Sequence, residues 1–120
     1  MPFNYLLTNL LVDVPEAVGA IFLDHEGETV EWVSRHDDPY ELKVEGAYHS
    51  IFKRQLETLA KNLDIGGMKS YWVIGDNLAT LTQTLPHGYY VVLVLKRSGP
   101  MAKAMYYLRS TATAIERELD

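Results

Sequence analysis

The sequence predicts an α+β domain in which a five-stranded, mainly antiparallel sheet lies between helices, in the order αββαβββα. The first observation is the run Tyr-Tyr-Val-Val-Leu-Val-Leu at 89–95, which has no polar interruption. A strand with one exposed face would alternate, so this run indicates a strand covered on both faces. Short turns separate most of the expected strands, which favours antiparallel neighbours. Three further segments carry apolar residues at helical spacing.

The composition indicates a single domain spanning residues 1–120, with the apolar and charged fractions of a soluble globular protein. The net charge of −5 argues against nucleic-acid binding and against attraction to anionic membranes. No apolar run approaches the roughly 20 residues of a membrane-spanning helix. The absence of cysteine excludes disulfides and thiolate chemistry. The N-terminus lacks the features of a secretory signal, so we expect a cytoplasmic protein.

The first third of the chain predicts a helix followed by a hairpin. Phe3, Leu6, Leu7, Leu10 and Leu11 share one helical stripe that ends before Val14-Pro15. Strands are expected at 18–24 and 29–34, with the turn Asp24-His25-Glu26-Gly27 between them. The first strand is apolar on both sides and belongs in the sheet interior. The second strand alternates and belongs nearer an edge.

The middle of the chain predicts a long second helix. A polar loop at 35–38 leads into Asp38-Pro39-Tyr40-Glu41, which resembles a capping box with proline at the first helical position. Gly46 weakens a continuous helix from that point, so two starts stay open, at this capping box or as late as Lys43. The helix then runs to about Leu63, before Gly66-Gly67.

The last half of the chain predicts a three-stranded meander and a final helix. Strands are expected at 69–75, 78–85 and 89–95, and Pro100 opens the helix. The apolar stripe of that helix comprises Met101, Ala104, Met105, Leu108, Ala112, Ile115 and Leu119.

The second helix has more apolar surface than one sheet face covers. Its apolar residues are Val44, Ala47, Tyr48, Ile51, Phe52, Leu56, Leu59, Ala60 and Leu63. They spread over roughly 220° of the helix, more than twice the width of one packed face. A large apolar patch left in water usually marks an interface, most simply with a two-fold copy. The alternative is that the loop at 35–42 covers the arc, or that some alanine and tyrosine side chains are exposed.

The strand at 69–74 is expected at the sheet border with little protection against pairing. It carries Tyr71, Trp72, Val73 and Ile74 and no proline. Pairing this strand with its copy would make one continuous sheet and place the second helices side by side. The predicted dimer interface therefore comprises Ile51, Phe52, Leu56, Leu59, Leu63, Tyr71, Trp72 and Val73.

The element order and several segments resemble the roadblock / dynein light-chain family, a three-layer, profilin-like fold. The matching segments are the leucine-rich first helix with 14–20 after it, the turn at 23–27, Leu59-Ala60-Lys61-Asn62-Leu63, and the strand at 90–95. The resemblance implies a stand-alone prokaryotic form that dimerises with itself or with a paralogous roadblock protein. It also implies a scaffold or regulator of a small Ras-like GTPase.

The polar arc of the second helix is the predicted GTPase contact. Its residues are Ser50, Lys53, Arg54, Glu57 and Lys61. An ordinary solvated helix face accounts for the same pattern.

No catalytic or metal-binding arrangement is recognisable in the sequence. The four histidines lack a metal-ligand spacing, and neither a phosphate-binding loop nor a nucleophile elbow is present. We therefore expect no enzyme activity, no metal and no cofactor. The leading hypothesis is a homodimeric GTPase regulator or scaffold. The rivals are a small-molecule-sensing domain of the profilin- or GAF-like sort, and a non-catalytic subunit of a larger signalling complex.

Overall fold

The computed structural model describes residues 2–35, 69–76, 78–96 and 100–119. The described elements, in chain order, are α1 (Pro2–Asp13), β1 (Ala17–Leu23), β2 (Thr29–Ser34), β3 (Ser70–Ile74), β4 (Leu78–Thr84), the 3-10 turn η1 (Pro86–Gly88), β5 (Tyr90–Lys96) and α3 (Met101–Leu119). Each of these helices and strands, η1 apart, matches an element expected from the sequence within about two residues at either end. The helix expected at 43–63 lies outside the described residues.

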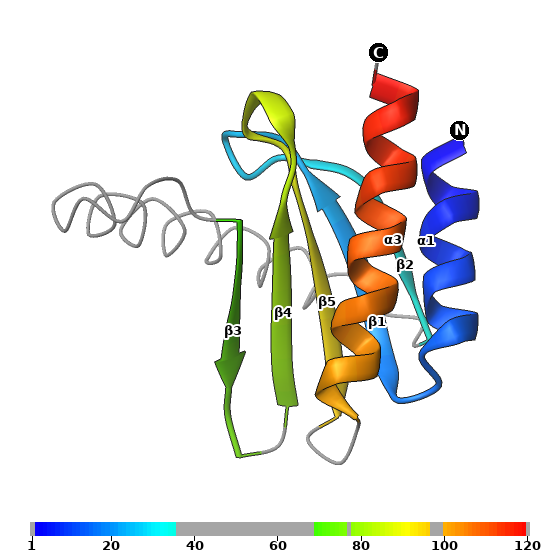
Figure 1. The fold of residues 1–120 in the computed structure, drawn as a ribbon, viewed down its shortest axis with the longest axis vertical. Helices are drawn as coiled ribbons and strands as arrows, with labels where there is room; N and C mark the ends of the chain where they lie inside the picture. The colour runs from blue at the N-terminus through cyan, green and yellow to red at the C-terminus, as the bar shows by residue number, and fades with distance from the viewer. Residues whose placement is uncertain (1, 36–68, 77, 97–99, 120) are drawn as a thin grey trace, which may run out of the picture.

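The five strands form one antiparallel sheet in the order β2-β1-β5-β4-β3, which confirms the predicted fold class (Figure 1). β5 lies in the centre, between β1 and β4. Ile21 of β1 faces Val92 of β5, and Leu81 of β4 faces Leu93 of β5. The strands β2 and β3 form the two borders of the sheet, as their sequences predict.

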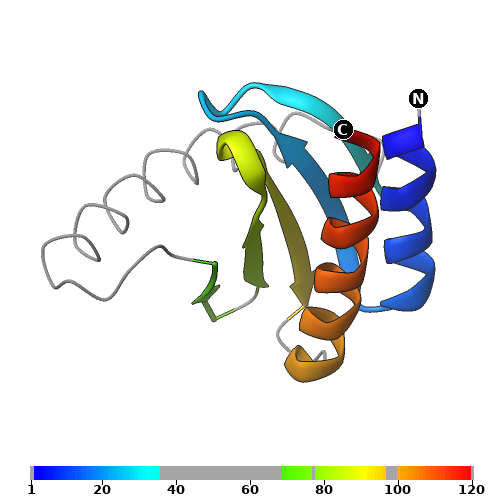
Figure 2. The same cartoon turned by 45° about the horizontal axis from the view of Figure 1, so that its top comes forward.

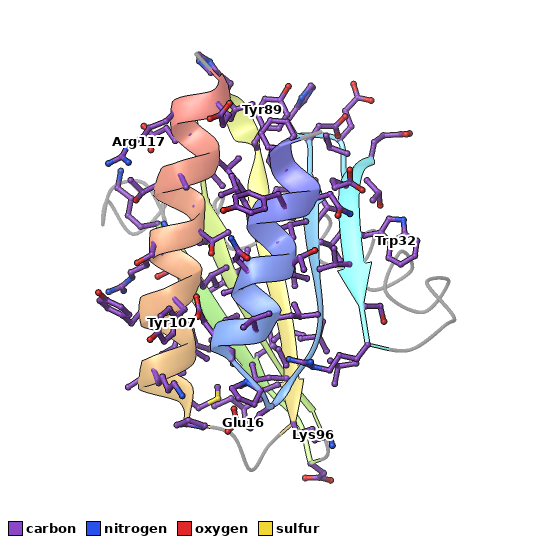
Figure 3. All side chains as sticks on the ribbon, turned by 90° about the vertical axis from the view of Figure 1, so that its right-hand side faces the viewer. Glu16, Trp32, Tyr89, Lys96, Tyr107 and Arg117 are labelled. Carbon is purple, nitrogen blue, oxygen red and sulfur yellow. The ribbon has the colours of Figure 1, made fainter. Side chains whose placement is uncertain are left out.

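Both described helices pack on the same face of the sheet (Figures 2 and 3). Leu7 and Leu10 of α1 and Leu108 of α3 are fully buried against Phe22 and Leu93 of the sheet. The aromatic rings of Phe3 and Phe22 pack with their centroids 4.9 Å apart. The helix residues among them, Phe3, Leu7, Leu10 and Leu108, belong to the two predicted helical stripes. Periodicity alone therefore identified the core-facing sides of both helices.

The opposite face of the sheet is also buried along its centre. Ile21, Leu23, Tyr90, Val92 and Val94 form a second apolar cluster on this face. The strands β1 and β5 are thus buried on both faces, which confirms the interpretation of their uninterrupted apolar runs.

Two turns meet at one end of the sheet. In the β1–β2 turn, Oδ1 of Asp24 accepts hydrogen bonds from the backbone N–H groups of Glu26 and Glu28. The turn before β5 places Gly88 at φ +82°, where a Cβ would lie 2.6 Å from Cβ of His25. Glycine is required there both for its positive φ and for this close approach. The two histidine-containing turns are therefore packing features of the fold.

Within the described ranges, neither helix is both long and apolar enough to cross a membrane.

Candidate interaction surface

The strand β3 is an exposed border of the sheet. Among the described strands it pairs with β4 alone (Figure 1). The exposed fractions of Trp72, Val73 and Ile74 are 45%, 39% and 52%, whereas most apolar side chains of β1 and β5 have almost no exposure. Large apolar side chains on an unpaired border strand are a typical site of strand addition.

In the β3–β4 ladder, hydrogen-bonded and non-hydrogen-bonded residue pairs alternate, and this alternation determines which backbone groups of β3 face outward. The N–H of Thr84 donates to the carbonyl of Lys69 at 2.8 Å. In an antiparallel ladder such bonds recur at every second residue, so the N–H and C=O groups of Tyr71 and Val73 face β4. Those of Ser70, Trp72 and Ile74 consequently point away from the sheet, where a further strand would pair.

The other border strand, β2, is partly blocked against strand pairing by one of its own side chains, that of Glu31. The N–H of Arg35 donates to the carbonyl of Val18, and the same alternation turns the N–H of Trp32 outward. That N–H donates to Oε1 of Glu31 at 3.2 Å. A carboxylate over an outward N–H both satisfies the donor and discourages strand pairing. Figure 3 shows Trp32 projecting beyond β2 at this border. The two borders of the sheet therefore differ, and β3 is the one suited to pairing.

The side chains of β3 divide between the two faces of the sheet. Trp72 and Ile74 lie beside Leu81 and Ala79, on the face that carries α3. Tyr71 and Val73 are on the opposite face, beside Thr82 and Thr80. The helix α3 packs on β4 and β5, so Trp72 and Ile74 lie beyond the end of the helix layer.

A second surface feature is a groove of about 740 Å³ between α1 and β2. It is lined by Asn4, Thr8, Leu11, Val12, Glu31, Trp32, Val33, Ser34 and Arg35. Val12 in its wall is 70% exposed, so the groove is open rather than enclosing. Sites for small ligands usually enclose most of the ligand surface. Sequence reasoning missed this groove because its walls come from residues about 25 positions apart.

In the part of the chain that the structure describes, no group of three or more His, Cys, Asp or Glu side chains is placed to hold a metal ion. His25 forms an exposed pair with Glu26, with 3.5 Å between Nε2 and Oε1.

Three predicted interface residues, Tyr71, Trp72 and Val73, come together on β3. Ile74 was not among the predicted interface residues, although it is the most exposed side chain of the strand. The other predicted interface residues, Ile51, Phe52, Leu56, Leu59 and Leu63, lie outside the described residues. So do the predicted GTPase contacts Ser50, Lys53, Arg54, Glu57 and Lys61.

Comparison with known proteins depends on structure, since no family model and no curated protein matches the sequence. The crystal structure of a Roadblock/LC7 domain from Streptomyces avermitilis superposes with a TM-score of 0.88, covering 97% of this chain and 96% of that chain at 18% identity. This chain has the Roadblock/LC7 fold. The resemblance noted in the sequence is thereby confirmed at the level of the fold.

Two Myxococcus xanthus proteins share the roadblock fold. MglB superposes with a TM-score of 0.90 at 9% identity, covering 99% of this chain and 95% of that chain. MglC superposes with a TM-score of 0.71 at 24% identity, covering 98% of this chain and 99% of that chain. At such identities the likeness shows the fold, and the surface residues must be argued from this chain itself.

Proposed function

We propose that two copies of this chain pair through β3 and that the dimer binds a small Ras-like GTPase as a regulator or scaffold. The observation that carries the dimer is the open border of β3, where Ser70, Trp72 and Ile74 turn their backbone groups outward. Pairing with a copy satisfies these groups and yields one continuous sheet. A paralogous roadblock protein with the same border would pair in the same way, so a heterodimer belongs to this proposal.

Strand pairing alone provides limited stability to such a dimer. Each net hydrogen bond contributes roughly 0.5–1.5 kcal/mol, and only a few form across a five-residue strand. Stable interfaces also bury about 1,200–2,000 Å² of accessible surface in total. We propose that the apolar residues of the predicted second helix, including Ile51, Leu56 and Leu59, contribute that area.

Support for the GTPase partner comes from the family resemblance. Two further neighbours share the fold: the gliding protein MglB from Thermus thermophilus, with a TM-score of 0.86, and MglB in a tetrameric arrangement. For this chain we propose that Ser50, Lys53, Arg54, Glu57 and Lys61 contact the GTPase. We also propose that it acts in the cytoplasm.

We propose that the chain contributes no catalytic group of its own. A regulator that orders the GTPase's own residues lowers the hydrolysis barrier by positioning, without adding a side chain to the reaction. The dimer then acts on the rate of nucleotide hydrolysis or, as a scaffold, only on where the GTPase is held.

The test is co-purification with a Ras-like GTPase from the same genome, loaded with GDP or with a non-hydrolysable GTP analogue. We expect the chain to bind the GTPase. Binding to one nucleotide form alone supports a regulator, whereas equal binding to both forms supports a scaffold. Arg54→Ala should weaken it, while the matched change Lys103→Ala on the exposed side of α3 should not. Absence of binding to either form would refute the GTPase partner.

The open groove between α1 and β2 favours one alternative, a domain that senses a small molecule. This alternative predicts that the dimer binds no GTPase and that substitutions such as Thr8→Trp, in the groove wall, abolish ligand-induced stabilisation. The openness of the groove makes it the second candidate.

A further inference from the structure

The groove between α1 and β2 has opposite charges at its two ends. Glu31, Val33 and Arg35 line it from β2 and share one side of that strand, because side chains alternate along a strand. At about 3.3 Å per residue, Glu31 and Arg35 are about 13 Å apart along the strand. The groove therefore has a carboxylate at one end, a guanidinium at the other and an apolar side chain midway.

The guanidinium of Arg35 is held in place while its charge is not neutralised. Three of its five N–H donors bond to the backbone carbonyls of Leu11, Val14 and Ala17. Carbonyls are neutral, and among the described residues no carboxylate forms an ion pair with Arg35. Within the same part of the chain, the two donors of Nη1 have no partner. A positioned cation with unused donors suits an anionic group of a ligand.

The carboxylate of Glu31 forms the acidic end of the groove. It accepts a bond from the N–H of Trp32 at 3.2 Å, and none of the described cations forms an ion pair with it. Glu28, in the exposed turn before β2, adds a second negative charge near this end. The ligand group that complements this end is therefore a cation.

The opposite wall of the groove is uncharged. It consists of side chains from one side of α1, namely Asn4, Thr8, Leu11 and Val12. From residue 2 to residue 12 this helix contains no charged side chain, so the two ends on β2 set the charge pattern of the groove. The groove is open, which disfavours a small ligand but not an extended peptide, whose alternate side chains can enter such a surface.

We propose that this groove binds an extended peptide of another protein in which a basic and an acidic side chain lie four residues apart, with an apolar side chain midway. In an extended chain, residues i, i+2 and i+4 point to the same side and span about 13 Å. The basic side chain pairs with Glu31, the apolar one lies against Val33, and the acidic one bonds to Arg35. The strands β2 and β3 are opposite borders of the sheet, so this site does not depend on the β3-paired dimer.

The test measures the affinity of two labelled peptides by fluorescence anisotropy. Their central sequences are Lys-Thr-Val-Thr-Glu and the reverse order, because both chain directions can present the same charges to the groove. We expect at least one to bind, more tightly than a peptide with glutamine in place of both charged residues. Glu31→Gln keeps an acceptor for the N–H of Trp32 and removes the charge, so it should weaken binding about fivefold. The matched change Glu116→Gln, on the exposed side of α3, should not.

A double-mutant cycle shows whether the contact with Glu31 is direct. Replacing the peptide's lysine by glutamine should cost little further affinity in the Glu31→Gln variant, because the pair is already broken. Arg35 stays unchanged, since it also bonds to the backbone of α1. Replacing the peptide's glutamate by glutamine tests that end instead, and it should weaken binding.

Three results would overturn the peptide site. They are failure of both peptides to bind, equal affinity of the charged and uncharged peptides, and independent effects of the two glutamine changes in the cycle. None of them bears on the β3 dimer or the GTPase partner, which light scattering and co-purification test separately. A monomeric protein that bound the peptide would in turn remove the dimer and retain this site.

Discussion

Arg35 joins three parts of the chain through its guanidinium group. Its Nε donates to the carbonyl of Ala17 at 2.6 Å, and its Nη2 donates to the carbonyls of Val14, at 3.2 Å, and Leu11. Leu11 belongs to the last turn of α1, where carbonyls lack intrahelical partners and favour a cation. One side chain at the end of β2 thus caps α1 and fixes the start of β1.

Arg35→Met retains much of the side chain's apolar stem and removes the donors. We expect the free energy of unfolding to fall by about 1–3 kcal/mol, the usual range for losing hydrogen bonds from a charged group. Chemical denaturation measures it, with Arg109→Met as the matched control because Arg109 is exposed on α3. Equal losses in the two variants would contradict the capping role.

Thr82 illustrates the opposite case, a buried polar group without a partner. Its side chain is fully buried and its Oγ1 has no hydrogen-bond partner among the residues that the structure describes. Valine has nearly the same shape and lacks the hydroxyl that must be desolvated. We expect Thr82→Val to raise the free energy of unfolding by about 1 kcal/mol, which thermal denaturation would report as a few degrees.

The control for this prediction lies two residues along the same strand. Oγ1 of Thr84 donates to the carbonyl of Lys69 at 2.9 Å, so Thr84→Val removes a hydrogen bond. We expect that variant to be less stable than the wild type. A change in the same direction for both valine variants would contradict the interpretation.

At the scale of elements, the two border strands differ in whether they admit a neighbour. The outward N–H of Trp72 should be needed for pairing but not for folding, because proline is tolerated in a border strand where no ladder bond is lost. We expect Trp72→Pro to give a folded monomer and Trp72→Thr to remain dimeric, as measured by light scattering and circular dichroism.

Val73→Pro is the matched comparison, since the N–H of Val73 faces β4. It should lower stability as well as dimerisation. If Trp72→Pro remained dimeric, the pairing of β3 borders would be excluded.

The border strand β2 should pair with a strand of another chain when the Glu31 carboxylate, which accepts from the outward N–H of Trp32, is removed. Glu31→Val frees the N–H of Trp32 and adds a β-branched residue with high strand propensity. We expect species larger than a dimer that grow with protein concentration in light scattering. Glu28→Val, in the exposed β1–β2 turn, makes the same charge change and should not. If both variants formed larger species to the same extent, the cause would be the lost charge rather than the exposed border of β2.

At the scale of the whole molecule, the seam can be trapped covalently because the chain has no cysteine. A two-fold pairing of antiparallel strands brings only the residue on the axis within about 5.5 Å of its own copy, so one of the single cysteines in place of Tyr71, Trp72 or Val73 should yield a disulfide-linked dimer under mild oxidation and thereby report the register. Val12→Cys, on α1, should yield none. Non-reducing electrophoresis reads the result, and cross-linking at Val12 alone would place the interface elsewhere.

Much of this arrangement was predictable because it depends on neighbours in sequence. The apolar run at 89–95 corresponds to the central strand β5, and the edge position of β3 follows from the short turns of the meander. Tyr71, Trp72 and Val73 were singled out for the same reason. The bonds of Arg35 and the groove between α1 and β2 were missed, because no local pattern records a contact between residues so far apart.

For the described residues, the sequence by itself determined which segments are helices and strands, and which residues face the core, because period and turn chemistry act over a few residues. Only the tertiary structure decided which border of the sheet is open. That outcome depends on the phase of the ladder between β3 and β4, set where Thr84 bonds to Lys69, and on a Glu31 carboxylate that folds back over the N–H of Trp32. Both are hydrogen-bond geometries, and they exist only once the strands have come together.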